Sequence, residues 1–336
     1  MLSIEQIEAA CRRSEPVVLG DPVSRLSELP LHGTYYPLGF PVEIATNSED
    51  VLNEAGKSWT GFEKLFDLQP IELRVVVTDG HSECPPAPLC RVQRNLISNI
   101  ADRENFALCD MAQGFSFLSL TKTTVANTSY LRYFFLDAAV LCQLVTRYVT
   151  PIHAACVELD GRGVLICGDS GAGKSTLAYA CGQAGWTYVS DDASFLINGR
   201  QDRLVVGNSN QVRFRPSATE FFPELEGREV TQRPEIGKPS IELHTSRFQH
   251  IARSHLAHIE YVVFLNRREP ECQELVPFSR DVARYFMQQP LFSMPEMLEV
   301  QSAVIERLLA ADVLELRYQS LDWGIERLER LVREGR

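Results

Sequence analysis

The sequence predicts an α/β protein in two parts, an N-terminal α+β domain over residues 1–125 and a C-terminal α/β domain over residues 126–336. Three observations lead to this prediction. A chain of 336 residues is longer than the usual single domain. Short β-rich runs alternate with loops up to about residue 125, whereas a long apolar helix is expected at 131–149. A buried strand, a glycine-rich loop and a helix follow between 164 and 183, and strands and helices then alternate.

In the N-terminal part, β-branched and aromatic runs predict strands, and helical spacing of apolar residues predicts helices. The expected strands are 41–46, 72–78, 106–109 and 115–120, and the expected helices are 51–59 and 92–100. The proline-rich segment 84–88 is expected to be a surface loop, because proline lacks a backbone donor and restricts φ. A linker or a recognition strand is the alternative for this segment.

In the C-terminal part, apolar runs at 152–159 and 164–167 flank the turn 160–163, which predicts a β-hairpin with a buried second strand. The further strands expected are 186–190, 194–197, 203–206 and 260–265, and the helices are 176–183, 280–288, 295–310 and 322–333. The last helix is amphipathic.

Charge and hydropathy exclude two classes of partner. The formal net charge of −11 repels a nucleic-acid backbone, so no nucleic-acid partner is expected. The most apolar stretch, 133–149, is interrupted by Asp137, Gln143 and Arg147. It is too short and too polar for a bilayer span, and we expect a buried helix and no membrane association.

Cysteine usage predicts a reducing compartment. Nine cysteines are scattered without a C-x-x-C pair, which argues against a disulfide framework and against a zinc site. The N-terminal residues 1–5 lack the basic and then apolar pattern of a signal peptide. A cytoplasmic protein with reduced thiols is expected. The cysteines are Cys11, Cys84, Cys90, Cys109, Cys142, Cys156, Cys167, Cys181 and Cys272.

The strongest motif is the glycine loop between the strand 164–167 and the helix 176–183, in the context that a nucleotide-phosphate-binding P-loop requires. Its glycines let the backbone wrap around phosphates at a helix N-terminus. Lys174 is expected to reach the β- and γ-phosphates, and the Ser175 hydroxyl to ligate Mg²⁺. A glycine-rich turn that binds nothing is the alternative. The candidate nucleotide-binding residues are Gly168, Asp169, Ser170, Gly171, Ala172, Gly173, Lys174, Ser175 and Thr176.

Two adjacent acids, Asp191 and Asp192, follow the strand 186–190. We expect this strand beside the strand 164–167 in a parallel sheet, with the acids at the carboxyl end where ligands collect. Phosphoryl transfer needs a carboxylate for the metal and a base for the acceptor hydroxyl. The alternative is that both acids begin a solvent-exposed turn.

His153 stands just before the strand expected to pair with 164–167. From the residues alone, a catalytic histidine competes with a core imidazole or a ring packed on the helix 131–149.

Three elements occur in the order found in a known family: His153-Ala154-Ala155, the run 163–176 with its GxSGxGKS loop, and the run 185–192 ending in the paired aspartates. In this order they resemble the catalytic domain of HPr kinase/phosphorylase and its relatives. The likeness covers 131–197, with a weaker part at 261–265 and 316–318. The resemblance implies a P-loop kinase domain of the phosphoenolpyruvate carboxykinase-like type on a mixed sheet.

The same resemblance implies an ATP- and Mg²⁺-dependent kinase acting on a hydroxyl of a protein, peptide or small molecule, and assembly into homo-oligomers. By position, Lys174, Asp191, Asp192 and His153 would be catalytic, and Ser175 with Asp192 would hold Mg²⁺. The segment 207–216 contains no acid, so the chain looks more like the diverged HPr kinase-like proteins that act on other acceptors. Residues 1–125 are then candidates for acceptor recognition.

Several alternatives stay open at this point. Arg213, Arg215 and Lys238 are candidates to neutralise charge on the transferred phosphoryl group, or they are surface charges. The function itself has two alternatives: a regulatory protein that binds a nucleotide without transferring phosphate, and an inactive scaffold.

Overall fold

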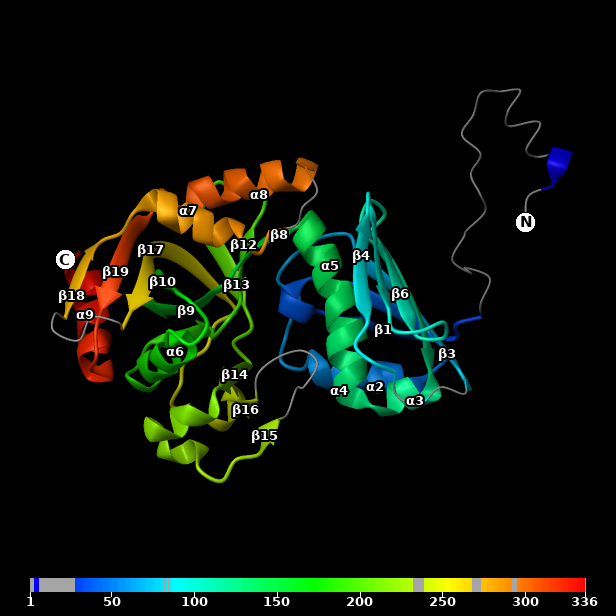
Figure 1. The fold of residues 1–336 in the computed structure, drawn as a ribbon, viewed down its shortest axis with the longest axis horizontal. Coiled ribbons are helices and arrows are strands. Elements are labelled where there is room, and N and C mark those ends of the chain that lie inside the picture. The colour runs from blue at the N-terminus through cyan, green and yellow to red at the C-terminus, as the bar shows by residue number, and fades with distance from the viewer. Residues whose placement is uncertain are drawn as a thin grey trace.

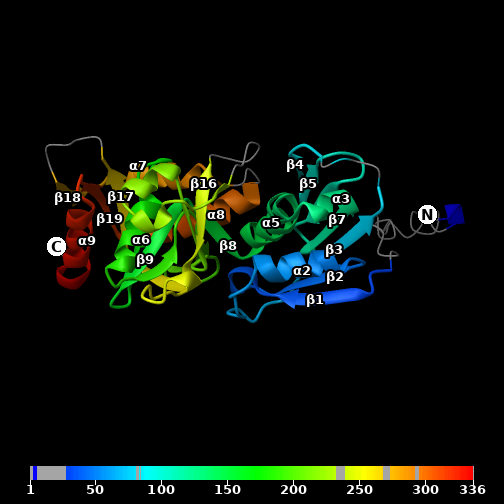
Figure 2. The ribbon, with the colours of Figure 1, turned by 90° about the horizontal axis from the view of Figure 1, so that it is seen from below.

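The computed structural model describes residues 3–5, 28–80, 83, 85–231, 239–267, 273–291 and 295–335. Within these residues the chain is a mixed α/β fold with several mixed sheets and helices. The chain forms a seven-stranded sheet and a nine-stranded sheet, in two halves that lie side by side in Figure 1, and Figure 2 shows the same halves from below. Residues named above that lie outside this description are Met1, Leu2, Cys11, Cys84, Lys238 and Cys272.

The seven-stranded sheet has the order β1-β2-β3-β7-β6-β5-β4. Strand Ile71–Thr78 carries a buried residue at every second position up to Val77, because one face packs on the core. The strands are β1 Leu31–Tyr35, β2 Val42–Thr46, β3 Ile71–Thr78, β4 Leu89–Gln93, β5 Leu96–Ile100, β6 Phe106–Asp110 and β7 Phe115–Thr121. The helices of this half are α2 Glu49–Ser58, α3 Lys122–Ala126, α4 Thr128–Tyr130 and α5 Asp137–Arg147.

The helix expected at 92–100 is wrong, because this segment forms the β4–β5 hairpin. Arg94, at the turn, adopts a left-handed φ of 55°, which reverses the chain direction. Ile97 is buried and pairs with Cys109 of β6. Apolar residues at 92, 96 and 100 fit a helical spacing, yet pairing with β6 decides the structure.

The nine-stranded sheet has the order β11-β9-β10-β17-β13-β12-β8, with β19 paired to β17 and β18 paired to β19. Strand β17 is parallel to β10 and β19, whereas the other pairs are antiparallel. The strands are β8 Val149–Ile152, β9 Ala154–Leu159, β10 Arg162–Cys167, β11 Thr187–Ser190, β12 Ser194–Ile197, β13 Leu204–Gly207, β17 Leu256–Asn266, β18 Glu274–Pro277 and β19 Asp312–Arg317.

Helices cover both faces of the nine-stranded sheet (Figure 1). One buried cluster joins α6 and α9 to the sheet, and a second cluster joins α7 and α8 to the opposite face. The helices are α6 Lys174–Gln183, α7 Arg280–Gln288, α8 Pro295–Leu308 and α9 Leu321–Glu334. Beside α6 lies a small sheet of β14 Gln211–Phe214, β16 Ser240–His244 and β15 Val230–Thr231. Among the residues described, no helix combines the length and apolar character that a bilayer span requires.

Helix α5 joins the two halves. Together with the π-helical segment Leu131–Leu136 it occupies the region expected to be one long helix. Its buried face packs on the seven-stranded sheet, and the same cluster includes Phe195 and Val206 of β12 and β13. The two sheets therefore share an apolar core across α5. The division into domains at 125/126 remains a prediction.

The strand expected at 152–159 is two strands. The chain changes neighbours at His153, since β8 pairs with β12 and β9 pairs with β10. His153 belongs to neither ladder. The six cysteines among the described residues form no disulfide with one another.

Candidate functional site

The glycine loop joins the end of β10 to the first residue of α6. Gly171 and Gly173 have φ values of 91° and 100°, a conformation that favours glycine. Gly173 directly precedes the helix, where the first backbone N–H groups have no partner within the helix. Backbone N–H donors and the positive end of the helix dipole therefore face the same space at the start of α6. This arrangement suits an anion such as a phosphate.

Lys174 is folded into this loop. Its side chain is only 5% exposed, and Nζ donates to the carbonyl oxygens of Gly168 at 2.8 Å and Asp169 at 3.3 Å. Burial lowers the pKa of Lys174, while the charge of Asp192 acts in the opposite direction. The loop backbone therefore holds the ammonium in place beneath the glycines.

His153 completes the surroundings of Lys174. Its Nε2 lies 3.1 Å from Lys174 Nζ, and its Nδ1 lies 3.1 Å from the backbone oxygen of Asp192. A carbonyl only accepts, so we assign the ring proton to Nδ1, which leaves Nε2 to accept from the ammonium. His153 thus connects the glycine loop to the paired aspartates. The ring is 41% exposed, so it is not a core imidazole, and a catalytic role for His153 stays a prediction.

The two aspartates have different environments. Asp191 is partly buried, and its Oδ2 accepts from the Arg213 backbone N–H at 2.6 Å. Burial raises the pKa of Asp191 to about 6, with the charge of Asp192 adding to the effect and the Arg213 hydrogen bond opposing it. The Asp192 side chain is 64% exposed, with Oδ1 3.5 Å from His153 Nδ1. The pKa of Asp191 is thus raised towards neutral pH, whereas the Asp192 carboxylate is open to solvent.

The expected strand arrangement needs a correction. Strand β11, which precedes the aspartates, is not beside β10, because β9 lies between them and pairs antiparallel with both. The neighbour of β10 on its other side is the parallel strand β17. Two successive antiparallel pairings leave β11 and β10 in the same direction, so Asp191 still reaches the edge of the sheet where the glycine loop lies.

Ser175 lies at the same edge, where its Oγ donates to the backbone oxygen of Asp191 at 3.3 Å. A hydroxyl and two carboxylates supply the oxygen ligands that Mg²⁺ prefers. Among the described residues no group of three or more His, Cys, Asp or Glu side chains has metal-site geometry. Mg²⁺ in phosphate sites is usually held by one or two carboxylates together with phosphates, so the residues present fit this ion.

A cavity of about 310 Å³, here called the phosphate cavity, opens in front of the loop. Arg215 reaches back to the loop with Nη2 donating to Ser170 Oγ at 3.3 Å. Among the candidate nucleotide-binding residues, Gly168, Asp169 and Ala172 belong to the loop but not to the cavity wall. The predicted residues that line the wall are Ser170, Gly171, Gly173, Lys174, Ser175, Thr176, Asp191, Asp192, Arg213 and Arg215.

Two site residues escaped the sequence-based prediction. Arg267 lines the phosphate cavity, and its guanidinium lies 5.8 Å and 5.7 Å from the ring centres of Phe221 and Tyr318. It directly follows β17, so the available signal was a basic residue after a strand parallel to β10. Glu242 lies opposite Arg213 in the β14–β16 ladder, with Oε1 3.5 Å from Arg213 Nε. It lines neither the phosphate cavity nor any wall shared with the aspartates, and it contacts the site through Arg213.

A second cavity, of about 500 Å³ and here called the junction cavity, touches the same aspartates from the other side. It shares Asp191, Asp192 and Arg213 with the phosphate cavity, and its remaining wall includes apolar side chains of the N-terminal half such as Trp59 and Phe62. Both aspartates therefore stand between two spaces.

Comparison with known proteins adds little. No protein-family model matches the chain. No curated protein matches it either. Among solved structures, the Hpr(Ser) kinase/phosphatase from Coxiella burnetii is similar, with 19% sequence identity, a TM-score of 0.29, and coverage of 55% of this chain and 99% of that one. An identity and a TM-score this low do not support an assignment of activity.

Proposed function

We propose that this chain is a phosphotransferase that uses ATP and Mg²⁺ to phosphorylate a hydroxyl group. The observation that carries the proposal is the shared edge of the nine-stranded sheet, where buried Lys174 in the glycine loop is joined through His153 to the backbone of Asp192. Phosphoryl transfer depends mainly on positioning and on charge stabilisation, and this edge offers groups for both.

The loop and the side chains around it have separate tasks in this proposal. The N–H groups at the start of α6 and Lys174 bind the β- and γ-phosphates. Arg213, Arg215 and Arg267 face the same space and stabilise negative charge on the phosphoryl group in transit. Mg²⁺, when bound, supplies further charge neutralisation at the phosphate oxygens, and Ser175 and Asp192 are the residues proposed to hold it.

Asp191 is the proposed general base. A carboxylate with a pKa of about 6 is mostly ionised at neutral pH and is more basic than an ordinary aspartate. It takes the proton of the acceptor hydroxyl as that oxygen bonds to the γ-phosphorus, while the bond from phosphorus to the bridging oxygen of ADP breaks. The products are the phosphate ester, ADP and a proton on Asp191.

Calorimetric titration with ATP and Mg²⁺, and then with GTP, tests the phosphate site. Lys174→Ala should weaken ATP binding at least about tenfold, since hydrogen bonds to a charged group contribute about 1.5–3 kcal/mol. Lys64→Ala is the matched control, because Lys64 is half-exposed and lines neither the phosphate cavity nor the junction cavity. A wild-type protein that binds neither nucleotide would overturn the proposal.

Asp191→Asn separates a kinase from a protein that binds nucleotide only as a signal. A kinase should keep ATP binding and lose ATP turnover, by about a hundredfold or more for removal of a general base. A regulatory nucleotide-binding protein should bind ATP equally well with and without the substitution, and should show no ATP turnover that depends on Asp191. The second result would replace the kinase with this alternative.

A further inference from the structure

A third pocket, here called the basic pocket, adjoins the junction cavity and has a volume of about 500 Å³. It shares Arg132, Asn208 and Gln211 with the junction cavity, which in turn shares Asp191 with the phosphate cavity. The three spaces therefore form a row, with the aspartates between the first and the second. A molecule that extends from the basic pocket through the junction cavity reaches the proposed base.

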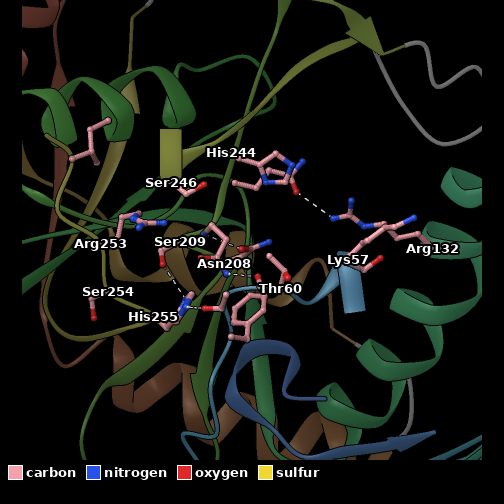
Figure 3. A pocket seen from close by; sticks show the side chains of 16 residues that line it. Lys57, Thr60, Arg132, Asn208, Ser209, His244, Ser246, Arg253, Ser254 and His255 are labelled. Carbon is pink, nitrogen blue, oxygen red and sulfur yellow. Dashed lines mark hydrogen bonds between the residues drawn. The ribbon is translucent and has the colours of Figure 1, made fainter. Parts of the chain in front are cut away.

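The charge of the basic pocket is one-sided. Among the residues that line it are Lys57, Arg132, His244, Arg253 and His255, and none of its lining residues is Asp or Glu. Figure 3 shows Arg253, His244 and Arg132 arranged around this space, together with serine and asparagine side chains. The chain as a whole has a formal charge of −11, so this cluster runs against the overall composition. Such a lining favours a ligand with anionic oxygens.

Carboxylates outside the wall compensate part of this charge. Lys57 Nζ lies 3.8 Å from Glu54 Oε2, and Arg132 Nε lies 3.4 Å from Asp137 Oδ2. Across the described part of the chain, no carboxylate lies within 4 Å of Arg253. The pKa of His244 is lowered by burial and by the positive charges of Arg247 and Arg132. A net positive field therefore remains at the end of the pocket near Arg253.

The pocket is built from both halves of the molecule and held by hydrogen bonds. Asn210 Nδ2 donates to the Thr60 oxygen at 3.2 Å, and His255 Nε2 lies 3.1 Å from the Gly61 oxygen (Figure 3). Arg253 is held through the backbone, since the Tyr188 N–H of β11 donates to the Ala252 oxygen at 2.8 Å. The strand that directly precedes Asp191 therefore also positions the basic pocket.

We propose that the basic pocket binds a carboxylate or phosphate group of the acceptor, a small organic anion whose hydroxyl-bearing part lies in the junction cavity beside Asp191. The inference rests on the proposed function for the role of the ligand, but not for the binding of an anion. Trp59 and Phe62 on the junction wall pack against the apolar part of such an acceptor. Arg253 and Arg132 hold its charged end.

Binding is tested with inorganic phosphate and with acetate, titrated by NMR into Lys174→Ala protein so that binding at the glycine loop is weakened, and followed through the resonances of residues that line the basic pocket. Adding Arg253→Gln should weaken binding about tenfold, because one charge-assisted contact is lost. Arg333→Gln is the matched control, since Arg333 is half-exposed on α9 and lies outside the pocket. The probe that binds with the higher affinity shows whether the pocket prefers phosphate or carboxylate. No binding of either probe, or equal binding with Arg253→Gln, would overturn the proposal.

The acceptor role is tested with matched pairs of hydroxy acids and their primary amides in ATP turnover. Acids should be used about tenfold better than amides, and Arg253→Gln should remove this preference while the KM for ATP stays the same. Equal use of acid and amide, or no use of any pair by protein that binds ATP, overturns the acceptor role. If the chain does not bind ATP, the proposed kinase function is wrong. Anion binding at Arg253 is measured without ATP, so that result does not affect it.

Discussion

Lys174 Nζ lies 3.1 Å from His153 Nε2, and the opposite nitrogen of the same ring lies 3.1 Å from the backbone oxygen of Asp192. One imidazole thus connects the ammonium of the glycine loop to the segment that carries both aspartates. His153 lies between β8 and β9, where the chain passes from the ladder with β12 to the ladder with β10. The loop and the acids are separate in sequence, and this ring makes them one hydrogen-bonded unit.

Replacing His153 with alanine should weaken ATP binding about tenfold, because the ammonium of Lys174 loses a hydrogen bond and the Asp192 backbone loses its partner. Calorimetry with ATP and Mg²⁺ measures the change. His250→Ala is the control, since His250 is exposed and lines none of the three cavities. Unchanged affinity in His153→Ala would show that the ring has no part in holding Lys174.

ATP turnover should rise with pH around a midpoint near 6, the pKa to which burial raises Asp191. Turnover rises with pH because only the ionised carboxylate of Asp191 can take the proton of the acceptor hydroxyl, and the ionised fraction increases as the pH passes the pKa. A pH profile of kcat/KM between pH 5 and pH 8 measures it, with the protein checked for folding at each pH. The residual activity of Asp191→Asn should not rise with pH around this midpoint. If it does, the titrating group is not Asp191.

Gly207→Ala should lower the free energy of unfolding by about 1–3 kcal/mol, because overpacking forces backbone shifts. An added Cβ would lie 2.7 Å from the Val189 backbone oxygen and 2.8 Å from Ser190 Cβ, in the strand that leads to Asp191. Urea denaturation measures the loss. Gly56→Ala in α2 is the control, since its Cβ would meet only Tyr35 at an ordinary 3.7 Å. Similar stabilities for the two variants would contradict this prediction.

Gln143→Leu should cost about 1–3 kcal/mol of stability, because buried acceptors lose their donor. The Gln143 side chain is fully buried in α5, and Nε2 donates to the oxygens of Phe115 at 2.9 Å and Asp110 at 3.2 Å. Urea denaturation of Gln143→Leu beside Gln113→Leu, whose side chain is exposed, measures the effect. If Gln113→Leu lost stability and Gln143→Leu did not, the prediction would be wrong.

The helices and strands of the C-terminal half were largely predictable. The strand before the glycine loop, the helix after it and the strand before the aspartates lie where the apolar runs place them. Each depends on local properties, namely runs of buried side chains and glycines that accept positive φ. The hairpin Leu89–Ile100 was not predictable in this way, because pairing of β5 with β6 overrides a helical spacing.

The sequence by itself determined the glycine loop, the acids after the strand 187–190 and the histidine ahead of the hairpin, because each depends on a few neighbouring residues. Only the tertiary structure decided that β9 separates β11 from β10, that Glu242 faces Arg213, and that Lys57, Arg132 and Arg253 line one pocket. Residues far apart in the chain meet through strand order and register, which the packing of the whole core selects and no local spacing records.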